Sequence, residues 1–358
     1  MSTQLPLSQR EARGSILRRQ GLIEPFDEPL QAVRAMVAVQ TQYAASLPVA
    51  VAARLKKCRA GWDEAALQPG GSLIKSWSLR HTLHAHTRDD HALVVGSLGS
   101  HLHQDYIRFM QRRHTTSDIH KLEEVVLAAL QHGPMSRREL HERVPQLKSI
   151  DYVGWGMDVM GLAFRRRVCV VGRGATQMFC PLPEVEVEPS YGELLRRYLA
   201  SFGPATVADF TFWTGLKAPL AKKAFSEASD DLVTVTVEGM KGVRYALANL
   251  VTEESSKNFG VRLLAKFDPL VLAHKDKSLF IPIEHKTKVF RKAGQVEAVV
   301  LMDGIASGTW RIDRNANRAT FTVEPFRPFG KRETVQLRLE AERMAKAIGS
   351  KAAEVQFA

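Results

Sequence analysis

Cysteine is scarce in this sequence, and long apolar runs are missing. The 358 residues contain three cysteines, Cys58, Cys169 and Cys180, with no CxxC spacing, which argues against a disulfide framework and a structural zinc knuckle. The first residues, MSTQLPLSQREARG, lack the apolar core of a signal peptide, and no stretch approaches membrane-spanning length. We therefore expect a reducing, cytoplasmic environment and no contact with a membrane.

Familiar catalytic signatures are also missing. The sequence has no GxSxG elbow, no P-loop and no glycine-rich dinucleotide fingerprint after a strand, and the GRG at 172–174 fits a turn better. Histidines crowd into residues 81–103, where His84 and His86 could share one face of a strand, but no HExxH spacing accompanies them. We expect no cofactor and no metal site.

Positive charge is in excess. Fifty Lys and Arg residues oppose 38 Asp and Glu residues, for a net charge of +12, while 45% hydrophobic residues supply enough apolar surface for two or three cores. A basic surface gains affinity for nucleic acid by releasing counterions from the phosphates. The basic runs are spread along the chain: Lys56-Lys57, Arg112-Arg113, Arg137-Arg138, Arg165-Arg166-Arg167, Arg196-Arg197, Lys222-Lys223 and Lys331-Arg332. Their number favours a nucleic-acid partner, although any one pair fits a solvated helix face.

Two stretches repeat one design, beginning near Leu122 and Tyr191. In each, an amphipathic helix ends near a Gly-Pro, and Ser136 or Thr206 is placed to cap the next helix. A further helical segment follows, at 152–166 and 218–229, and then a β-hairpin, at 168–181 and 232–250. This order is typical of winged-helix DNA-binding units.

The first hundred residues fit the same plan less closely. Pro29 suits the first turn of a helix, and a second helix is expected from Pro48 towards Lys57. The segment SLIKSWSLRHTLHAHT alternates apolar and polar residues, which predicts one strand. Its polar face would present Arg80 and His84 together to a ligand.

The residues after Val261 have a different character. They predict a hairpin with a two-residue turn at Asp303-Gly304, another strand at 318–326 and a closing helix over 333–348. We therefore expect an α+β protein of four parts: a winged-helix-like motif in residues 1–118, winged-helix (helix-turn-helix) motifs in 119–188 and 189–260, and a C-terminal β-rich module in 261–358. Trp77, Trp213 and Trp310 are expected in the cores, and Asp268 in a turn.

Two glutamines, Gln40 and Gln42, stand one residue apart where an apolar series ends. Leu30, Val33 and Val37 recur at helical spacing, and Gln40 takes the next place in that series. The amides could bond to the backbone at a helix end or form a site together. In an unbroken helix they would point to opposite sides, so we expect the helix to end near Gln40 and the chain to become extended there.

Several blocks, collinear over nearly the whole chain, resemble the AlkZ/YcaQ-like family of DNA glycosylases. They are QTQ at 40–42 with VAARL at 51–55, SWSLRHTLH at 76–84, FGPATVADFTFWTGL at 202–216, FDPLVLAHKDK at 267–277 and VLMDGIASGTWR at 300–311. The set is fairly specific, although no single block is decisive.

The resemblance implies tandem winged-helix motifs in a C-shaped arrangement around a basic channel, and removal of N7- or N3-alkylated purines, including crosslinked ones. Gln40 and Gln42 match the catalytic motif of AlkZ-like members, and Thr41 stands where the family usually has an aliphatic residue. The resemblance and the basic runs together suggest DNA contacts by Arg80, His84, Arg165, Arg166, Arg167 and Arg173. The expected enzyme is a monofunctional, monomeric glycosylase acting on duplex DNA with alkylated or crosslinked purines, in the cytoplasm at the nucleoid.

Two other classes of protein share these features. A winged-helix transcriptional regulator without catalysis would bind a symmetric operator as a dimer. A scaffold that uses its winged helices for protein contacts would bind plain duplex without salt dependence, if it bound at all.

Overall fold

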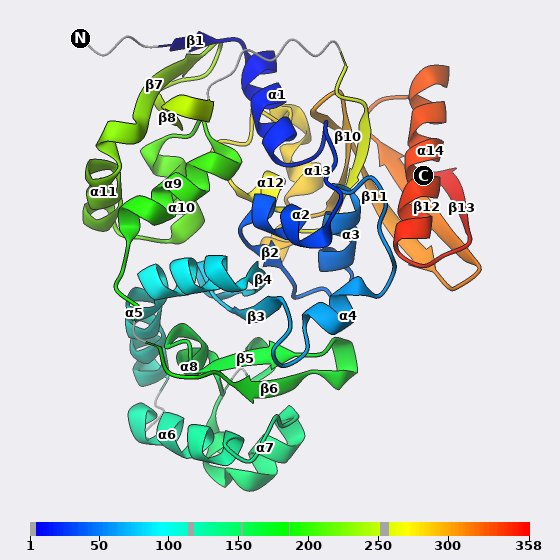
Figure 1. The fold of residues 1–358 in the computed structure, drawn as a ribbon. Coiled ribbons are helices and arrows are strands. Elements are labelled where there is room, and N and C mark those ends of the chain that lie inside the picture. Colours follow the sequence, from blue (N-terminus) through cyan, green and yellow to red (C-terminus); the bar gives the residue numbers. More distant parts are fainter. Residues whose placement is uncertain (1–4, 114–117, 152, 186, 251–257) are drawn as a thin grey trace.

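The chain folds as an α+β protein with helices packed around three β-sheets (Figure 1), which confirms the expected class. The computed structural model describes residues 5–113, 118–151, 153–185, 187–250 and 258–358. The four-part division, the winged-helix identity of the units and the C-shaped outline around a basic channel stay predictions.

The central sheet combines strands from two distant parts of the chain, in the order β2-β4-β3-β5-β6. Its strands are β2 (Val39–Gln40), β3 (Leu73–Trp77), β4 (Leu83–Thr87), β5 (Val168–Val171) and β6 (Met178–Pro181). Strands β5 and β6 form the hairpin predicted at 168–181, and Lys75 of β3 pairs with Val170 of β5. This sheet therefore joins residues 39–87 to the hairpin.

The prediction of a single strand over residues 72–87 is wrong. Strands β3 and β4 run antiparallel, with Trp77 opposite Leu83, and a short turn (Leu79–His81) connects them. Arg80 and His81 in this turn have φ values of 53° and 59°, a left-handed conformation that the apolar-polar alternation does not reveal. All residues of both strands are buried, so the alternation does not separate a solvent face from a core face.

The two repeated helix pairs form as predicted. The first is α6 (Ile119–Leu130) with α7 (Arg137–Arg143), and the second is α9 (Tyr191–Phe202) with α10 (Val207–Thr214). The Ser136 hydroxyl accepts a hydrogen bond from the Glu139 amide, and the Thr206 hydroxyl accepts one from the Asp209 amide. In both capping boxes the carboxylate in turn accepts a hydrogen bond from the backbone N–H of the capping residue. The helical segment expected at 152–166 is broken into a 3-10 turn (Val153–Trp155) and α8 (Met160–Phe164), with turns at 156–159 between them, and Tyr152 lies outside the described residues.

A second sheet, β1-β7-β8, packs beside α9 and α11 (Ala218–Glu227). Strands β7 (Leu232–Val237) and β8 (Arg244–Leu247) are the hairpin predicted after the second helix pair. Strand β1 (Leu5–Leu7) pairs in parallel with β7, so the N-terminal residues join this part of the molecule.

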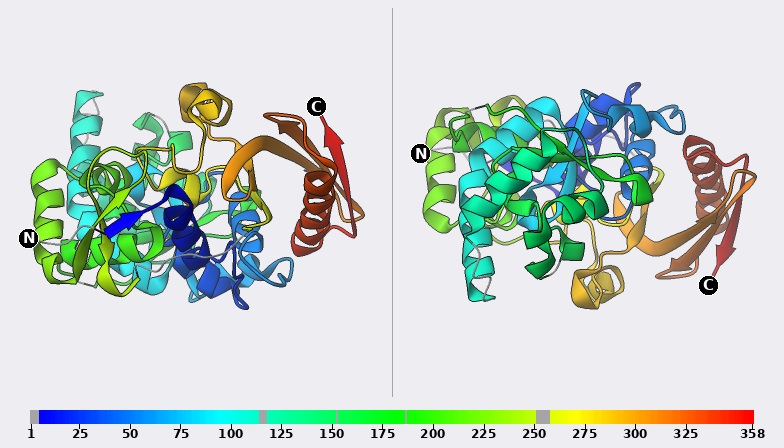
Figure 2. Two further views of the ribbon diagram at one scale, coloured as in Figure 1. Left: turned by 90° about the horizontal axis from the view of Figure 1, so that it is seen from above. Right: turned by 90° about the horizontal axis from the view of Figure 1, so that it is seen from below.

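The third sheet has the order β13-β12-β11-β10-β9, and Figure 2 shows it with α14 at one end of the molecule. Its elements are β9 (Val261–Leu264), β10 (Ala298–Met302), β11 (Ile305–Arg314), β12 (Arg318–Pro325), α14 (Lys331–Ala347) and β13 (Ala352–Phe357). The turn at Asp303-Gly304 connects β10 to β11 as predicted, with φ values of 46° and 80°. Strand β13, which pairs in parallel with β12, was not predicted.

The other α-helices carry the chain between the strands of the three sheets. They are α1 (Gln9–Arg19), α2 (Pro29–Met36), α3 (Ser46–Ala52), α4 (Trp62–Ala66), the long α5 (Arg88–Arg112), α12 (Pro269–Leu272) and α13 (Lys286–Val289). Pro29 occupies the first turn of α2 as predicted. Within the described ranges, no helix is long and apolar enough to cross a bilayer.

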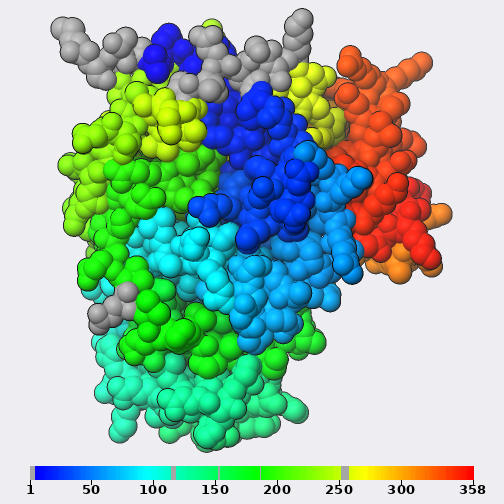
Figure 3. All heavy atoms as spheres, viewed as in Figure 1, coloured from blue at the N-terminus to red at the C-terminus, as the bar shows by residue number. Residues whose placement is uncertain are grey.

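The apolar core connects the two ends of the chain. One cluster of buried side chains contains residues from 7 to 85 and from 235 to 348, and Figure 3 shows the N-terminal segment beside the C-terminal part. Trp77, Trp213 and Trp310 are 6%, 4% and 3% exposed, which confirms them as core residues. Arg54 and Asp268, both fully buried, form an ion pair of 2.7 Å between these ends, and Asp268 also caps α12.

Candidate active site

The backbone before the glutamines turns sharply out of α2. The helix ends at Met36, and the Ala38 amide donates to the Met36 carbonyl over 2.7 Å, forming a γ-turn around Val37. Val37 has φ 62° and ψ −53°, an unfavourable conformation for a β-branched residue. The chain is then extended in β2, which confirms the expectation that the helix ends before Gln40 and an extended segment follows.

The two glutamine side chains meet. Gln40 Nε2 donates to Gln42 Oε1 over 2.6 Å; Gln40 is 4% exposed, whereas Gln42 is exposed. In an extended backbone, residues two apart point to the same side, so both amides reach one face. Thr41 points to the other side, where its hydroxyl and its amide both donate to the Leu83 carbonyl, over 3.2 and 2.8 Å. The hydroxyl in this motif therefore has a hydrogen bond of its own.

Buried histidines support the strand that carries Gln40. Gln40 pairs with His84 of β4, and the Ser78 hydroxyl lies 3.1 Å from His84 Nδ1 and 2.9 Å from His86 Nε2. His86 Nδ1 lies 3.1 Å from the Val37 carbonyl, which fixes the neutral Nδ1–H tautomer. Burial lowers the pKa of His84 well below its ordinary value and the pKa of His86 to about 4. These rings are neutral parts of the scaffold.

His84 therefore does not share a polar face with Arg80. It is 2% exposed and hydrogen-bonded inside the protein, so a direct DNA contact by His84 is contradicted by the structure. The physical reason is the turn between β3 and β4, which puts Arg80 and His84 in different surroundings. Arg80 lines a cavity together with both glutamines.

We call this space the aromatic cavity; its volume is about 480 Å³. The Arg80 guanidinium lies 5.3 Å from the centre of the Phe212 ring, and Phe267 stacks on Tyr43 at 5.6 Å. The residues that line the aromatic cavity come from distant segments: Gln40, Gln42, Arg80, Thr82, Trp155, Phe212, Phe267, Leu272, Phe290, Ala293, Gly294, Gln295 and Val296. The glutamine pair thus faces a space walled by aromatic rings and one guanidinium.

A second space, the basic cavity, lies on the other side of Gln42 and has a volume of about 450 Å³. It is lined by Thr41, Gln42, Trp77, Leu83, Ser136, Arg137, Arg138, Gly154, Trp155, Gly174, Ala175, Gln177 and Phe179. Gln42 and Trp155 line both cavities. Among the described residues, neither lining contains a carboxylate or a lysine.

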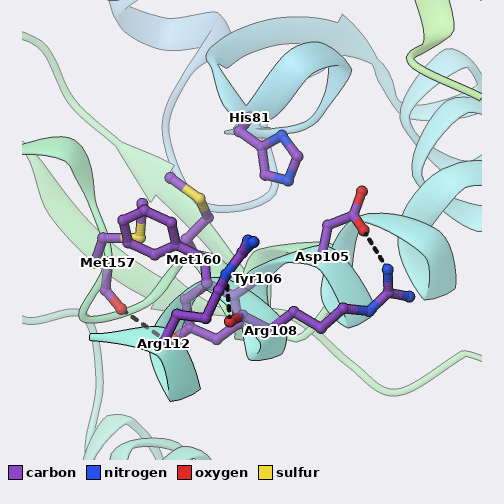
Figure 4. A pocket seen from close by; sticks show the side chains of 8 residues that line it. His81, Asp105, Tyr106, Arg108, Arg112, Met157 and Met160 are labelled. Atoms are coloured by element: carbon purple, nitrogen blue, oxygen red, sulfur yellow. Dashed lines mark hydrogen bonds and ion pairs between the residues drawn. The ribbon is translucent and has the colours of Figure 1, made fainter. Parts of the chain in front are cut away.

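A third cavity, of about 450 Å³, lies apart from the glutamines (Figure 4). His81 points into it from the β3–β4 turn, above Asp105, Arg108 and Arg112 of α5. Asp105 and Arg108 form an ion pair of 3.2 Å there. The consecutive residues Arg80 and His81 thus serve two different cavities, and only the first belongs to the candidate site.

The other predicted DNA-binding arginines are engaged within the protein. Arg165 pairs with Glu123, Arg167 with Glu184 and Arg173 with Asp63, each at 2.8 Å, and Arg166 donates to the Val185 carbonyl over 3.1 Å. The structure does not bring these four into the two cavities beside the glutamines. Their contact with DNA stays a prediction.

Sequence reasoning missed most of the aromatic wall. Phe212, Phe267 and Phe290 give no local signal, because single phenylalanines are ordinary core residues. The Lys277 ammonium contacts two of these rings, at 4.7 Å from the Phe212 ring and 5.2 Å from the Phe290 ring. It donates to the Val271 carbonyl over 2.9 Å. Burial lowers the pKa of Lys277 to about 7.

His103, His120 and Glu123 gather closely enough to hold a metal ion, at a place that the sequence did not suggest. However, the two Glu123 oxygens already accept from His103 Nε2 and Arg165 Nη1, both over 2.8 Å. The carboxylate is therefore neutralised by protein groups, and this cluster does not include the glutamines.

Comparisons with known proteins show the family to which the chain belongs. The family model for AlkZ-like DNA glycosylases matches residues 33–347, a range that includes both glutamines and every residue lining the two cavities. An interstrand DNA cross-link repair glycosylase from Streptomyces sahachiroi is 28% identical over 304 residues, covering 78% of this chain and 80% of that protein. The solved structure of the Streptomyces sahachiroi DNA glycosylase AlkZ has a TM-score of 0.81 at 24% identity and covers 99% of this chain and 100% of its own. The chain therefore belongs to the AlkZ-like family of DNA glycosylases.

Proposed function

We propose that this glycosylase excises purines carrying a cationic N7 or N3 alkyl group, including crosslinked purines, by directing water with Gln40 and Gln42. The observation that supports this most strongly is the amide pair, joined at 2.6 Å, at a cavity whose described lining has no carboxylate. The related Streptomyces protein is named for interstrand cross-link repair, which supports crosslinked DNA as a substrate.

Amides suit a lesion that is already charged. Neither glutamine can donate or accept a proton in the reaction, but an N7- or N3-alkylated purine carries a positive charge and leaves without protonation. The bond between the amides uses one Gln40 N–H and one Gln42 oxygen, so Gln40 Oε1 remains to accept a hydrogen bond from water. Its partial negative charge also favours the positive charge that develops on the sugar.

The same linings support a monofunctional reaction. A glycosylase that also cleaves the backbone uses an amine as nucleophile. The described residues around both cavities include no lysine, and the Lys277 ammonium, which lies against the Phe212 and Phe290 rings, is not among the lining groups. Water is then the nucleophile, and the product is an abasic site in an intact strand.

The proposed partner is duplex DNA bound by a single copy of the chain. The net charge of +12 favours phosphates, and Arg80 brings a cation beside the glutamines. The alternative of a non-catalytic regulator is contradicted by membership of a glycosylase family.

The decisive experiment compares excision from duplexes that contain N7-methylguanine, a purine crosslink, uracil or no lesion. We expect release of the cationic purines and very slow release of uracil, because a neutral base needs an acid to leave. Gln42→Ala and Gln40→Ala should each slow excision by roughly 10² to 10⁴ while DNA affinity changes little.

The matched control is Gln131→Ala, which removes an exposed amide at the end of α6. This variant should excise at the rate of the unmodified protein. Unchanged excision of N7-methylguanine by Gln42→Ala would contradict the proposal, as would equally fast release of uracil.

A further inference from the structure

Trp155 is an exposed aromatic residue at the junction of the two cavities. Its side chain is 69% exposed, and it lines both the aromatic cavity and the basic cavity, as Gln42 does. Trp77, Trp213 and Trp310 are all at most 6% exposed. A large apolar ring open to solvent beside the catalytic amides offers a surface for a flat ligand.

The backbone at Trp155 is held firmly, although the residue is 69% exposed. The Trp77 indole N–H donates to the Trp155 carbonyl over 3.1 Å. The next residue, Gly156, has φ 92°, and a Cβ there would lie 2.2 Å from the Trp77 ring. Gly156 also accepts hydrogen bonds from the Val159 and Met160 amides, over 3.0 and 2.8 Å. These contacts fix the position from which the indole projects.

The groups around the indole suit a nucleic acid. Arg137 is held by Asp158 at 2.9 Å and lies over the Phe179 ring at 5.3 Å. Arg138 next to it is 84% exposed in its side chain, and its nearest carboxylate, on Glu142, is 3.9 Å away. A cation and an aromatic face side by side match the phosphate and the base of one nucleotide.

We propose that Trp155 stacks on a nucleobase beside the lesion and so aligns the damaged nucleotide with Gln40 and Gln42. This inference rests on the proposed function, because the amides mark where the sugar must lie. Successive nucleotides are only about 3.4 Å apart along a strand, so a base on an indole that adjoins Gln42 belongs to the lesion or to an immediate neighbour. Every base has a π face, so the contact is independent of sequence.

The test compares Trp155→Ala with Trp155→Phe, using a duplex with one N7-methylguanine. Loss of one base–aromatic stack should slow single-turnover excision at subsaturating protein by roughly 10- to 100-fold in Trp155→Ala. Phe keeps a π face and should restore the rate to within about threefold. Leu339→Ala, which removes an exposed apolar side chain on α14 (60% exposed), is the matched control and should leave excision unchanged.

A fluorescence measurement tests the contact without chemistry. Binding of the duplex, with or without the lesion, should quench the tryptophan emission of the unmodified protein, and the quenching should be largely lost in Trp155→Phe. Melting temperatures of the variants establish that they fold, as expected for an exposed side chain.

The outcomes separate this inference from the function on which it rests. If the unmodified protein excises N7-methylguanine but Trp155→Ala does so equally fast, Trp155 has no such role and the glycosylase assignment stands. An equal loss in the Phe and Ala variants, or quenching that persists in Trp155→Phe, would also overturn stacking. If the unmodified protein releases no alkylated purine, the proposed function itself fails.

Discussion

Thr41 stands between the two glutamines, where the resemblance led us to expect an aliphatic residue. Its side chain donates to the Leu83 carbonyl and is 6% exposed, on the side of the backbone away from the amides. The residue thus anchors β2 to β4 while its neighbours face the cavity. The position of both glutamines depends on this alternation.

We expect Thr41→Val to keep the site intact. Valine preserves the shape and restores an aliphatic residue, and the Thr41 amide still satisfies the Leu83 carbonyl over 2.8 Å. Loss of one neutral hydrogen bond should change the free energy of unfolding by about 1 kcal/mol at most. Excision of N7-methylguanine should remain near the unmodified rate; a 100-fold loss would show that the hydroxyl acts in the reaction.

The buried ion pair of Arg54 and Asp268 should stabilise the folded protein. Arg54→Met leaves the buried Asp268 carboxylate without its cation, and breaking a buried pair costs about 3–5 kcal/mol. Lys56→Ala removes an exposed pair with Asp27 and should cost less than about 1 kcal/mol. Urea unfolding of both variants checks the contrast, and similar small losses would contradict it.

At the scale of secondary structure, capping and turn chemistry made several elements predictable. Ser136 and Thr206 cap their helices, and Asp303-Gly304 turns between β10 and β11, because these conformations are encoded by adjacent residues. The β3–β4 hairpin was not predicted, because its left-handed turn residues are Arg80 and His81 rather than glycine or asparagine. Strand β13 was not predicted, although Ala353, Val355 and Phe357 alternate with two polar residues, a pattern that could have indicated a strand.

The buried histidines of β4 should make the central sheet sensitive to acid. The pKa of His86 is about 4 in the folded protein, against an ordinary value of 6.5. Between these pH values the unfolded chain binds the proton more readily than the folded protein does. The contribution of neutral His86 to stability is therefore complete above pH 6.5 and is lost as the pH falls towards 4. From His86 alone, stability should drop by about 3 kcal/mol between pH 7 and pH 4. Burial shifts the pKa of His84 and His91 in the same direction and adds to the loss.

Chemical unfolding at several pH values measures this effect. His86→Gln should be less stable at pH 7, because it alters the contacts to Ser78 and Val37, but its stability should fall less between pH 6.5 and pH 4. His132→Gln, which changes an exposed histidine, should follow the unmodified protein. A parallel decline in all three would contradict the assignment.

At the scale of the whole molecule, ion pairs within the protein neutralise part of the positive charge. Arg165, Arg167 and Arg173 all pair with carboxylates, so the formal charge overstates the cations open to DNA. Arg80 is placed differently, beside the glutamines and over an aromatic ring.

Salt dependence of duplex binding should reveal this difference. Affinity should fall as salt rises, and Arg80→Ala should reduce the slope of log K against log salt by about one, as for the loss of one phosphate contact. Arg167→Ala should reduce it less, because Glu184 already neutralises that guanidinium. Titrations from low to moderate salt check both values; an unchanged slope in Arg80→Ala would exclude a phosphate contact.

The sequence indicated the two glutamines but not the surfaces around them. The motif occupies three adjacent residues, whereas the aromatic cavity draws on residues from Gln40 to Val296, and their meeting depends on packing over long separations. Trp155 lies in a segment predicted as one helix, which is instead a 3-10 turn (Val153–Trp155) and α8, interrupted where Gly156 adopts a positive φ against Trp77. Such contacts leave no local pattern.

Because the cavity is lined by residues from distant segments, its assembly depends on the intact fold. A hydrolase for DNA is dangerous if a fragment or a half-unfolded copy keeps its activity but loses its selectivity. Here the amides come from one segment near the start of the chain and the aromatic wall from three remote segments, and the buried Arg54–Asp268 ion pair joins the chain near the amides to one of these segments. Unfolding separates the amides from these walls, so we expect excision to stop when the fold is lost.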